Sequence, residues 1–220
     1  MFHLISLFLT TLISLSIPTT ASPNSDNSTL DLDLDLYLDG PLAPWQITGL
    51  STHSPSGYPA NHPYSRLRVS IGDPNTVTLG STPFGDAAFP PTNATCTVWW
   101  QAYSEDPRDG PWVNTCSETR SGKWTVEILR TAEEGGGSAT TDFVLRFRLS
   151  EAVVLGTGAV VSLRFEGEAA FAVGAAPERN MGGACGGSSV CNWGLKDGVA
   201  PVLVNQTLVE ARCVAGECKL

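Results

Sequence analysis

Alternating apolar and polar positions recur along most of this chain. The two clearest segments are residues 143–149 and 161–166, in which every second side chain is apolar. Because successive side chains of a β-strand point to opposite faces, each segment predicts a strand with one buried face. The connection between them is short and rich in glycine, which predicts an antiparallel hairpin that places Arg148 opposite Glu166.

Shorter segments of the same kind follow one another between turns rich in Gly, Pro, Asn and Asp. They are residues 45–50, 66–71, 76–79, 95–100, 123–130, 169–173, 199–204 and 207–212. No sustained 3.6-residue apolar period follows residue 44, and 22 glycines with 15 prolines leave little room for long helices. The pattern predicts an all-β fold of about ten strands, an antiparallel β-barrel or a β-sandwich, since either arrangement removes exposed strand edges.

The first 21 residues predict a secretory signal peptide. An uncharged run at residues 4–17 is followed by Pro18 and by small residues up to Ala21, where we expect cleavage. The alternative is an uncleaved membrane anchor, but the run is shorter than the ~20 residues that a span needs. Because the rest of the chain has neither a second such run nor the tail of a GPI signal, we expect a secreted, extracellular protein without a membrane partner.

Residues 22–44 predict an acidic low-complexity leader that precedes a single β domain at residues 45–220. Aspartates alternate with apolar residues from Asp31 to Asp39. A strand with its aspartates on one face could attract calcium, but like charges at this spacing repel each other. A leader or edge strand explains the pattern without a ligand, so we expect no metal and no cofactor.

The net charge of −9 overstates the acidity of the β domain. Five of the 22 acidic residues lie between Asp26 and Asp39, and without them the charge is −4. A mildly acidic domain with no basic stripe does not neutralise phosphates, which argues against nucleic acid and anionic membranes as partners.

Six cysteines follow the signal peptide, and this even number predicts three disulfides formed in an oxidising compartment. They are Cys96, Cys116, Cys185, Cys191, Cys213 and Cys218. Without a CxxC motif, and with only His53 and His62 left after processing, a zinc site or a Cys/His nucleophile pair is hard to assemble. Sequons at Asn27, Asn93 and Asn205 predict N-glycans, with Asn93 favoured because we place it in a loop beside two prolines.

Residues 174–198 form the longest irregular stretch and predict an Ω-loop, which a Cys185–Cys191 bridge would pin. The Gly-Gly-Ser-Ser sequence within it matches neither a phosphate loop nor a nucleophile elbow. We therefore predict that this stretch has a structural role and contains no catalytic or phosphate-binding site.

Two residue combinations in the sequence could in principle support catalysis, and each has a simpler explanation. A Ser-His-Asp triad would need His53 or His62, which we place in an exposed loop at residues 51–64. Glu166 and Glu168 share one strand face, as a pair of glycosidase carboxylates could, yet strand alternation explains them fully. We therefore predict no catalytic residues and no enzymatic activity.

The tryptophans supply an alternative function. Trp99, Trp100, Trp112 and Trp193 fall in or beside predicted loops, where flat rings can stack on sugar faces. Adjacent Trp99 and Trp100 must point to opposite faces of a strand, so one is expected in the core and the other partly exposed. A carbohydrate-binding or cell-wall structural module is the alternative that follows.

Several of these segments together resemble a known family. They are Trp45-Gln-Ile-Thr-Gly-Leu50, the extended segment at residues 64–71, Cys96 followed by Trp112-Val-Asn-Thr-Cys116, and the later strands through Cys185 and Cys191. In this order they resemble the Alternaria major-allergen family of small secreted fungal β-barrel allergens and effectors, over residues 45–213.

The resemblance implies a compact antiparallel barrel, an intramolecular Cys96–Cys116 bridge, no enzymatic activity and release by a fungus into a host environment. The acidic leader, the wider spacing of that cysteine pair and the additional Cys213 and Cys218 depart from the family, which leaves the remaining pairing and the oligomeric state open. The combined prediction is an effector-like or allergen-like protein that binds a host (plant) protein or a cell-wall polysaccharide.

Overall fold

The computed structural model describes residues 41–58, 62–82, 85–119, 121–132 and 137–216. The predicted signal peptide, Asn27, Cys218 and all but the last four residues of the predicted leader lie outside these ranges. Among the described residues there is no helix, and consequently none long and apolar enough to cross a membrane.

Thirteen strands account for the described fold. They are β1 (Trp45–Ser54), β2 (Tyr64–Asp73), β3 (Val77–Thr82), β4 (Gly85–Phe89), β5 (Thr92–Gln101), β6 (Asn114–Thr115), β7 (Lys123–Leu129), β8 (Asp142–Val154), β9 (Val160–Ala172), β10 (Met181–Cys185), β11 (Cys191–Leu195), β12 (Val202–Val204) and β13 (Thr207–Ala215). Every pair of these strands is antiparallel. The predicted all-β antiparallel class is confirmed.

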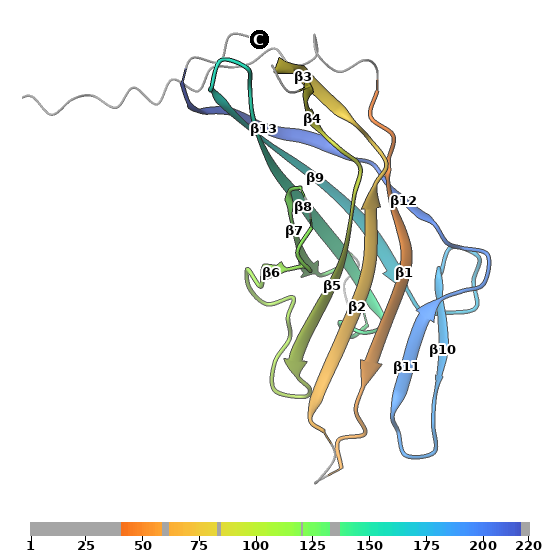
Figure 1. Cartoon of the computed structure of the whole chain (residues 1–220). Helices are drawn as coiled ribbons and strands as arrows, with labels where there is room; N and C mark the ends of the chain where they lie inside the picture. Colours follow the sequence, from red (N-terminus) through yellow and green to blue (C-terminus); the bar gives the residue numbers. More distant parts are fainter. Residues whose placement is uncertain (1–40, 59–61, 83–84, 120, 133–136, 217–220) are drawn as a thin grey trace, which may run out of the picture.

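Two sheets face each other as a sandwich (Figure 1). The first, sheet A, has the order β10-β11-β1-β2-β5, and β12 also pairs with β1. The second, sheet C, has the order β13-β9-β8-β7-β6. The β3–β4 hairpin is a separate two-stranded sheet, which Figure 1 shows at the end of the sandwich opposite the β1–β2 connection.

The core lies between the two sheets and is held at its centre by two tryptophans. Trp45 of β1 meets Trp124 of β7 edge to face, with ring centroids 4.7 Å apart, and both rings are fully buried. Gly167 of β9 makes room for this contact, because a Cβ there would lie 3.2 Å from the Trp45 ring and 2.7 Å from the Asn205 carbonyl oxygen. The chain between β12 and β13 therefore crosses from one sheet to the other directly over a glycine.

The other side of the sandwich is joined by a disulfide and by backbone hydrogen bonds. Cys96 in β5 is bonded to Cys116, which confirms the pairing that the family resemblance implied. The amide of Ser117 donates to the carbonyl of Thr95 at 2.8 Å, and the Thr95 amide donates to the Ser117 hydroxyl at 3.0 Å. These contacts occupy backbone groups at the free edge of β5. Cys213 is also disulfide-bonded.

The predicted Ω-loop at residues 174–198 is wrong, because this stretch contains the β10–β11 hairpin. Cys185 and Cys191 face each other at its tip and form the expected bridge. Sequence patterning missed the hairpin since glycines interrupt its alternation. Gly183 is required: its φ is 150°, and a Cβ would lie 2.1 Å from the Asn192 carbonyl oxygen.

Three further corrections concern strand boundaries. Residues 169–173 are not a separate strand, because β9 continues through them to Ala172. Strands β4 and β6 were not predicted, since one is dominated by small residues and the other has two residues. Asn93 is not in a loop but in β5, which begins directly after the two prolines, and its side chain is exposed.

The outer face of sheet C is covered by paired charges. Arg148 donates to Glu166 at 2.9 Å, as the hairpin register predicted, and Arg146 donates to Glu168 at 2.7 Å. Arg164 reaches Glu210 of β13 at 2.7 Å. The arginines of this face are therefore paired with glutamates of the same sheet.

One buried carboxyl group stands apart from these pairs. Glu151 of β8 points between the sheets with 4% of its surface exposed, and its Oε1 has no hydrogen-bond partner. Burial, together with the nearby charge of Asp73, raises the pKa of Glu151 to about 7. The fold therefore favours the protonated form of this side chain.

The raised pKa of Glu151 should make the free energy of unfolding depend on pH. The folded state holds a proton more tightly than the unfolded chain, whose glutamate ionises near 4.5, so the free energy of unfolding should fall as pH rises from about 5 to about 8. Glu151→Gln should remove this decline and stabilise the protein at pH 8 by about 1–3 kcal/mol, because the neutral amide does not ionise and so escapes the pH-linked loss that the raised pKa causes. Urea unfolding between pH 5 and pH 8 measures both effects. The exposed Glu118→Gln is the control, and an unchanged pH profile in Glu151→Gln would contradict the assignment.

The hairpin gives a second prediction. Gly183→Ala should destabilise the protein by about 1–3 kcal/mol, because the added methyl group meets the backbone of β11. Gly187→Ala, in the same hairpin but with open space around it, should change stability by less than about 0.5 kcal/mol. Equal thermal midpoints for the two variants would show that the close approach at Gly183 is not a constraint.

Candidate binding surface

Every exposed tyrosine or tryptophan among the described residues lies at one end of the sandwich. Tyr58, Tyr64, Trp99 and Tyr103 are 63%, 41%, 48% and 78% exposed. They belong to the β1–β2 connection, the start of β2, the end of β5 and the residues just after it, which Figure 1 shows together at the lower end of the view. We call these four residues the aromatic end.

Strand pairing brings these residues together from distant parts of the sequence. Tyr64 is opposite Gln101, and Arg66 is opposite Trp99, in the β2–β5 register. The amide of Ala102 donates to the carbonyl of Pro63 at 2.9 Å, so the chain after β5 stays beside the start of β2. Two segments that are distant in the sequence, the start of β2 and the end of β5, therefore lie side by side.

Trp99 lies on the outer face of sheet A, close to the Arg66 guanidinium and the His62 ring. The Arg66 guanidinium lies 5.2 Å from the Trp99 ring centroid, a cation–π distance. The His62 ring is 5.1 Å from the Tyr64 ring and 6.0 Å from the Trp99 ring. These contacts restrict the rotamers of the exposed rings before any ligand arrives.

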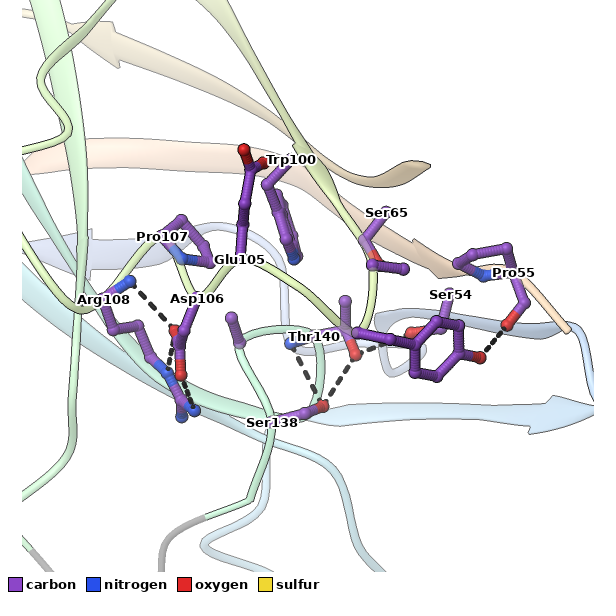
Figure 2. Close-up of a pocket in the computed structure, with 13 residues that line it drawn as sticks. Ser54, Pro55, Ser65, Trp100, Glu105, Asp106, Pro107, Arg108, Ser138 and Thr140 are labelled. Carbon is purple, nitrogen blue, oxygen red and sulfur yellow. Dashed lines mark hydrogen bonds and ion pairs between the residues drawn. The ribbon is translucent and has the colours of Figure 1, made fainter. Parts of the chain in front are cut away.

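A pocket of about 180 Å³ opens beside this end, on the inner side of the same strands (Figure 2). The buried Trp100 contributes one wall, while Ser54, Ser65, Ser138 and Thr140 contribute hydroxyl groups. The Thr140 hydroxyl lies 2.8 Å from those of both Ser54 and Ser138. An aromatic wall with nearby hydroxyl groups suits a small polar ligand such as one sugar ring.

Tyr103 connects the pocket to the aromatic end. Its hydroxyl donates to the carbonyl of Pro55 at 2.6 Å and so ties the residues after β5 to the β1–β2 connection. Its φ of 67° is unfavourable for a residue other than glycine. We attribute this backbone conformation to the hydrogen bond and to contact of the ring with Gly57.

The two carboxylates that line the pocket are both engaged. Glu105 accepts a hydrogen bond from the Gln101 amide at 2.7 Å. Asp106 accepts from Arg108 through both oxygens, at 2.8 and 2.7 Å, and also pairs with Arg130. The hydrogen bonds from Arg108 lower the pKa of Asp106, which keeps it ionised. Asp106 is therefore not set up as a proton donor, and Glu151, whose pKa is raised, does not line this pocket.

The other residues considered from the sequence are dispersed. His53 lies within β1 rather than in a loop, and its Nδ1 is 2.9 Å from Asn192 Oδ1. Glu166 and Glu168 belong to the ion pairs of sheet C. Asn205 is exposed between β12 and β13. Within the described ranges, no group of three or more His, Cys, Asp or Glu side chains could hold a metal ion.

The four tryptophans of the predicted sugar platform do not form one surface. Trp99 is exposed and Trp100 is buried, as alternation along a strand requires. Trp112 and Trp193 are partly buried and pack against the core. The tyrosines that accompany Trp99 were not singled out from the sequence, because only the fold brings them beside it.

Comparison with known proteins identified no relative of this chain. The chain matches no family model, no curated protein and no solved structure.

Proposed function

We propose that this chain is a secreted, non-enzymatic fungal protein, effector-like or allergen-like, that binds a host or cell-wall component through its aromatic end. The observation that carries the proposal is that the exposed Tyr58, Tyr64, Trp99 and Tyr103 all belong to segments at one end of the sandwich (Figure 1). Exposed large aromatic side chains that cluster in this way are typical of binding sites, since they supply large contact areas at low entropic cost.

The distribution of carboxyl groups supports binding rather than catalysis. Glycoside hydrolysis needs one carboxyl group that donates a proton beside a second that is ionised. In the pocket, Asp106 has a lowered pKa and an arginine partner, and Glu105 is bonded to the backbone. The disulfides Cys96–Cys116 and Cys185–Cys191 are consistent with an oxidising, extracellular setting.

A carbohydrate-binding module is the second candidate, and it uses the same surface. Trp99 with the neighbouring tyrosine rings offers flat faces for sugars, and the adjoining pocket offers hydroxyl groups. The two candidates differ in the ligand and share the binding residues.

A capture experiment tests the proposal. The oxidised mature protein is immobilised and exposed to plant apoplastic fluid, and in parallel it is incubated with insoluble chitin, glucan and cellulose. We expect capture of a discrete host protein or retention on one polysaccharide, and Tyr64→Ala/Trp99→Ala should reduce it at least about tenfold, because side chains at the centre of an interface dominate the binding energy.

Leu203→Ala is the matched control, since Leu203 is an exposed apolar residue of β12 outside the aromatic end. It should leave capture unchanged. Capture that survives the loss of both rings would place the binding surface elsewhere and contradict the proposal, as would no capture in either arm.

A further inference from the structure

Two arginines on the outer face of sheet A have no carboxylate partner among the residues that the structure describes. Every other described arginine forms an ion pair, namely Arg108, Arg130, Arg146, Arg148, Arg164, Arg179 and Arg212. Within the described ranges Arg66 and Arg68 of β2 form none, and Arg68 is exposed. These two guanidinium groups therefore remain available to an anionic partner.

The strands around them contain no competing acid. Arg68 lies between Ser51 of β1 and Thr97 of β5 in the sheet register. The one acidic residue within β1, β2 and β5 is Asp73, which is buried. Although the chain has a net charge of −9, these three strands present two arginines and no exposed acid, so this part of the surface is locally positive.

One of the two arginines lies beside a ring of the aromatic end. The Arg66 guanidinium lies over the Trp99 ring, 5.2 Å from its centroid, a contact that does not neutralise its charge or occupy its N–H donors with a carboxylate. Those donors match the two oxygens of a carboxylate. Arg66 and Arg68 are two residues apart on one strand, so their Cα atoms are about 7 Å apart along the sheet. The surface suits a ligand that presents carboxylates repeatedly beside apolar faces.

A sugar acid polymer has this combination, because each ring offers C–H faces for stacking and a carboxylate at its side. An acidic peptide fits less well. A peptide commonly adds as a strand to an open sheet edge, but Ser117 already bonds both backbone groups of Thr95 on that edge of β5. Nucleic acid requires more cations than two arginines supply.

Resting on the proposed function, we infer that the ligand is an acidic polysaccharide of uronic acid units. Its carboxylates bind Arg66 and Arg68, and its sugar rings stack on Tyr64 and Trp99. Exposed aromatic rings alone could bind neutral sugars as well. The inference is that Arg68 makes a negative charge on the ligand necessary for binding.

Isothermal titration of the full mature protein tests the inference with four probes. They are polygalacturonate, the same polymer fully methyl-esterified, a neutral glucan and polyglutamate. We expect binding of polygalacturonate, and binding at least about tenfold weaker for the methyl ester, which keeps the sugar faces but loses the charge. Tighter binding of polyglutamate than of polygalacturonate would overturn the inference in favour of an acidic peptide.

Variants of matched charge complete the test. Arg68→Gln should weaken polygalacturonate binding about five- to tenfold. Arg212→Gln removes one charge from the exposed, ion-paired face of sheet C and should change the affinity less than about twofold. Equal effects of the two variants, or equal affinity for the charged and esterified polymers, would overturn the inference. If a neutral glucan or a host protein binds through Tyr64 and Trp99 without polyuronate binding, the inference fails while the proposed function stands.

Discussion

The fold depends on the contact between two sheets, because neither sheet can bury its apolar face alone. Trp45 and Trp124 meet at the centre of this contact, and Gly167 leaves room both for the Trp45 ring and for the Asn205 carbonyl of the chain after β12. On the other side, the Cys96–Cys116 bridge joins β5 to the opposite sheet. With the inner faces fixed in this way, the alternation along each strand decides which side chains reach the surface.

The two outer faces produced by this constraint differ in their electrostatics. Sheet C presents arginines and glutamates that neutralise one another, so its outer face offers little to a charged ligand. Sheet A presents Arg66 and Arg68, which have no acidic partner in the described part of the chain, beside the exposed rings of Tyr64 and Trp99. Two adjacent tryptophans show the division most clearly: Trp100 forms part of the pocket wall inside, while Trp99 is exposed outside. The proposed binding role follows from this asymmetry.

Sequence patterning predicted the parts of this structure that depend on local alternation. The β8–β9 hairpin, its Arg148–Glu166 pair and the opposite directions of Trp99 and Trp100 all follow from a period of two. Patterning failed where glycine interrupts alternation, as in the β10–β11 hairpin around Gly183. It also could not find the aromatic end, because Tyr64 and Trp99 are brought together by the pairing of β2 with β5 and not by any local signal. Likewise, the sequence does not tell which arginines form ion pairs. Only the structure shows that Arg68 has no carboxylate partner among the described residues.

The most direct test of this account is a map of where the ligand touches the protein. Backbone amide NMR shifts recorded during titration with a short oligogalacturonate would provide it. The account predicts changes confined to the start of β2, the end of β5 and the β1–β2 connection, together with the indole N–H of Trp99. Changes centred on the outer face of β8 and β9, with these segments undisturbed, would contradict it.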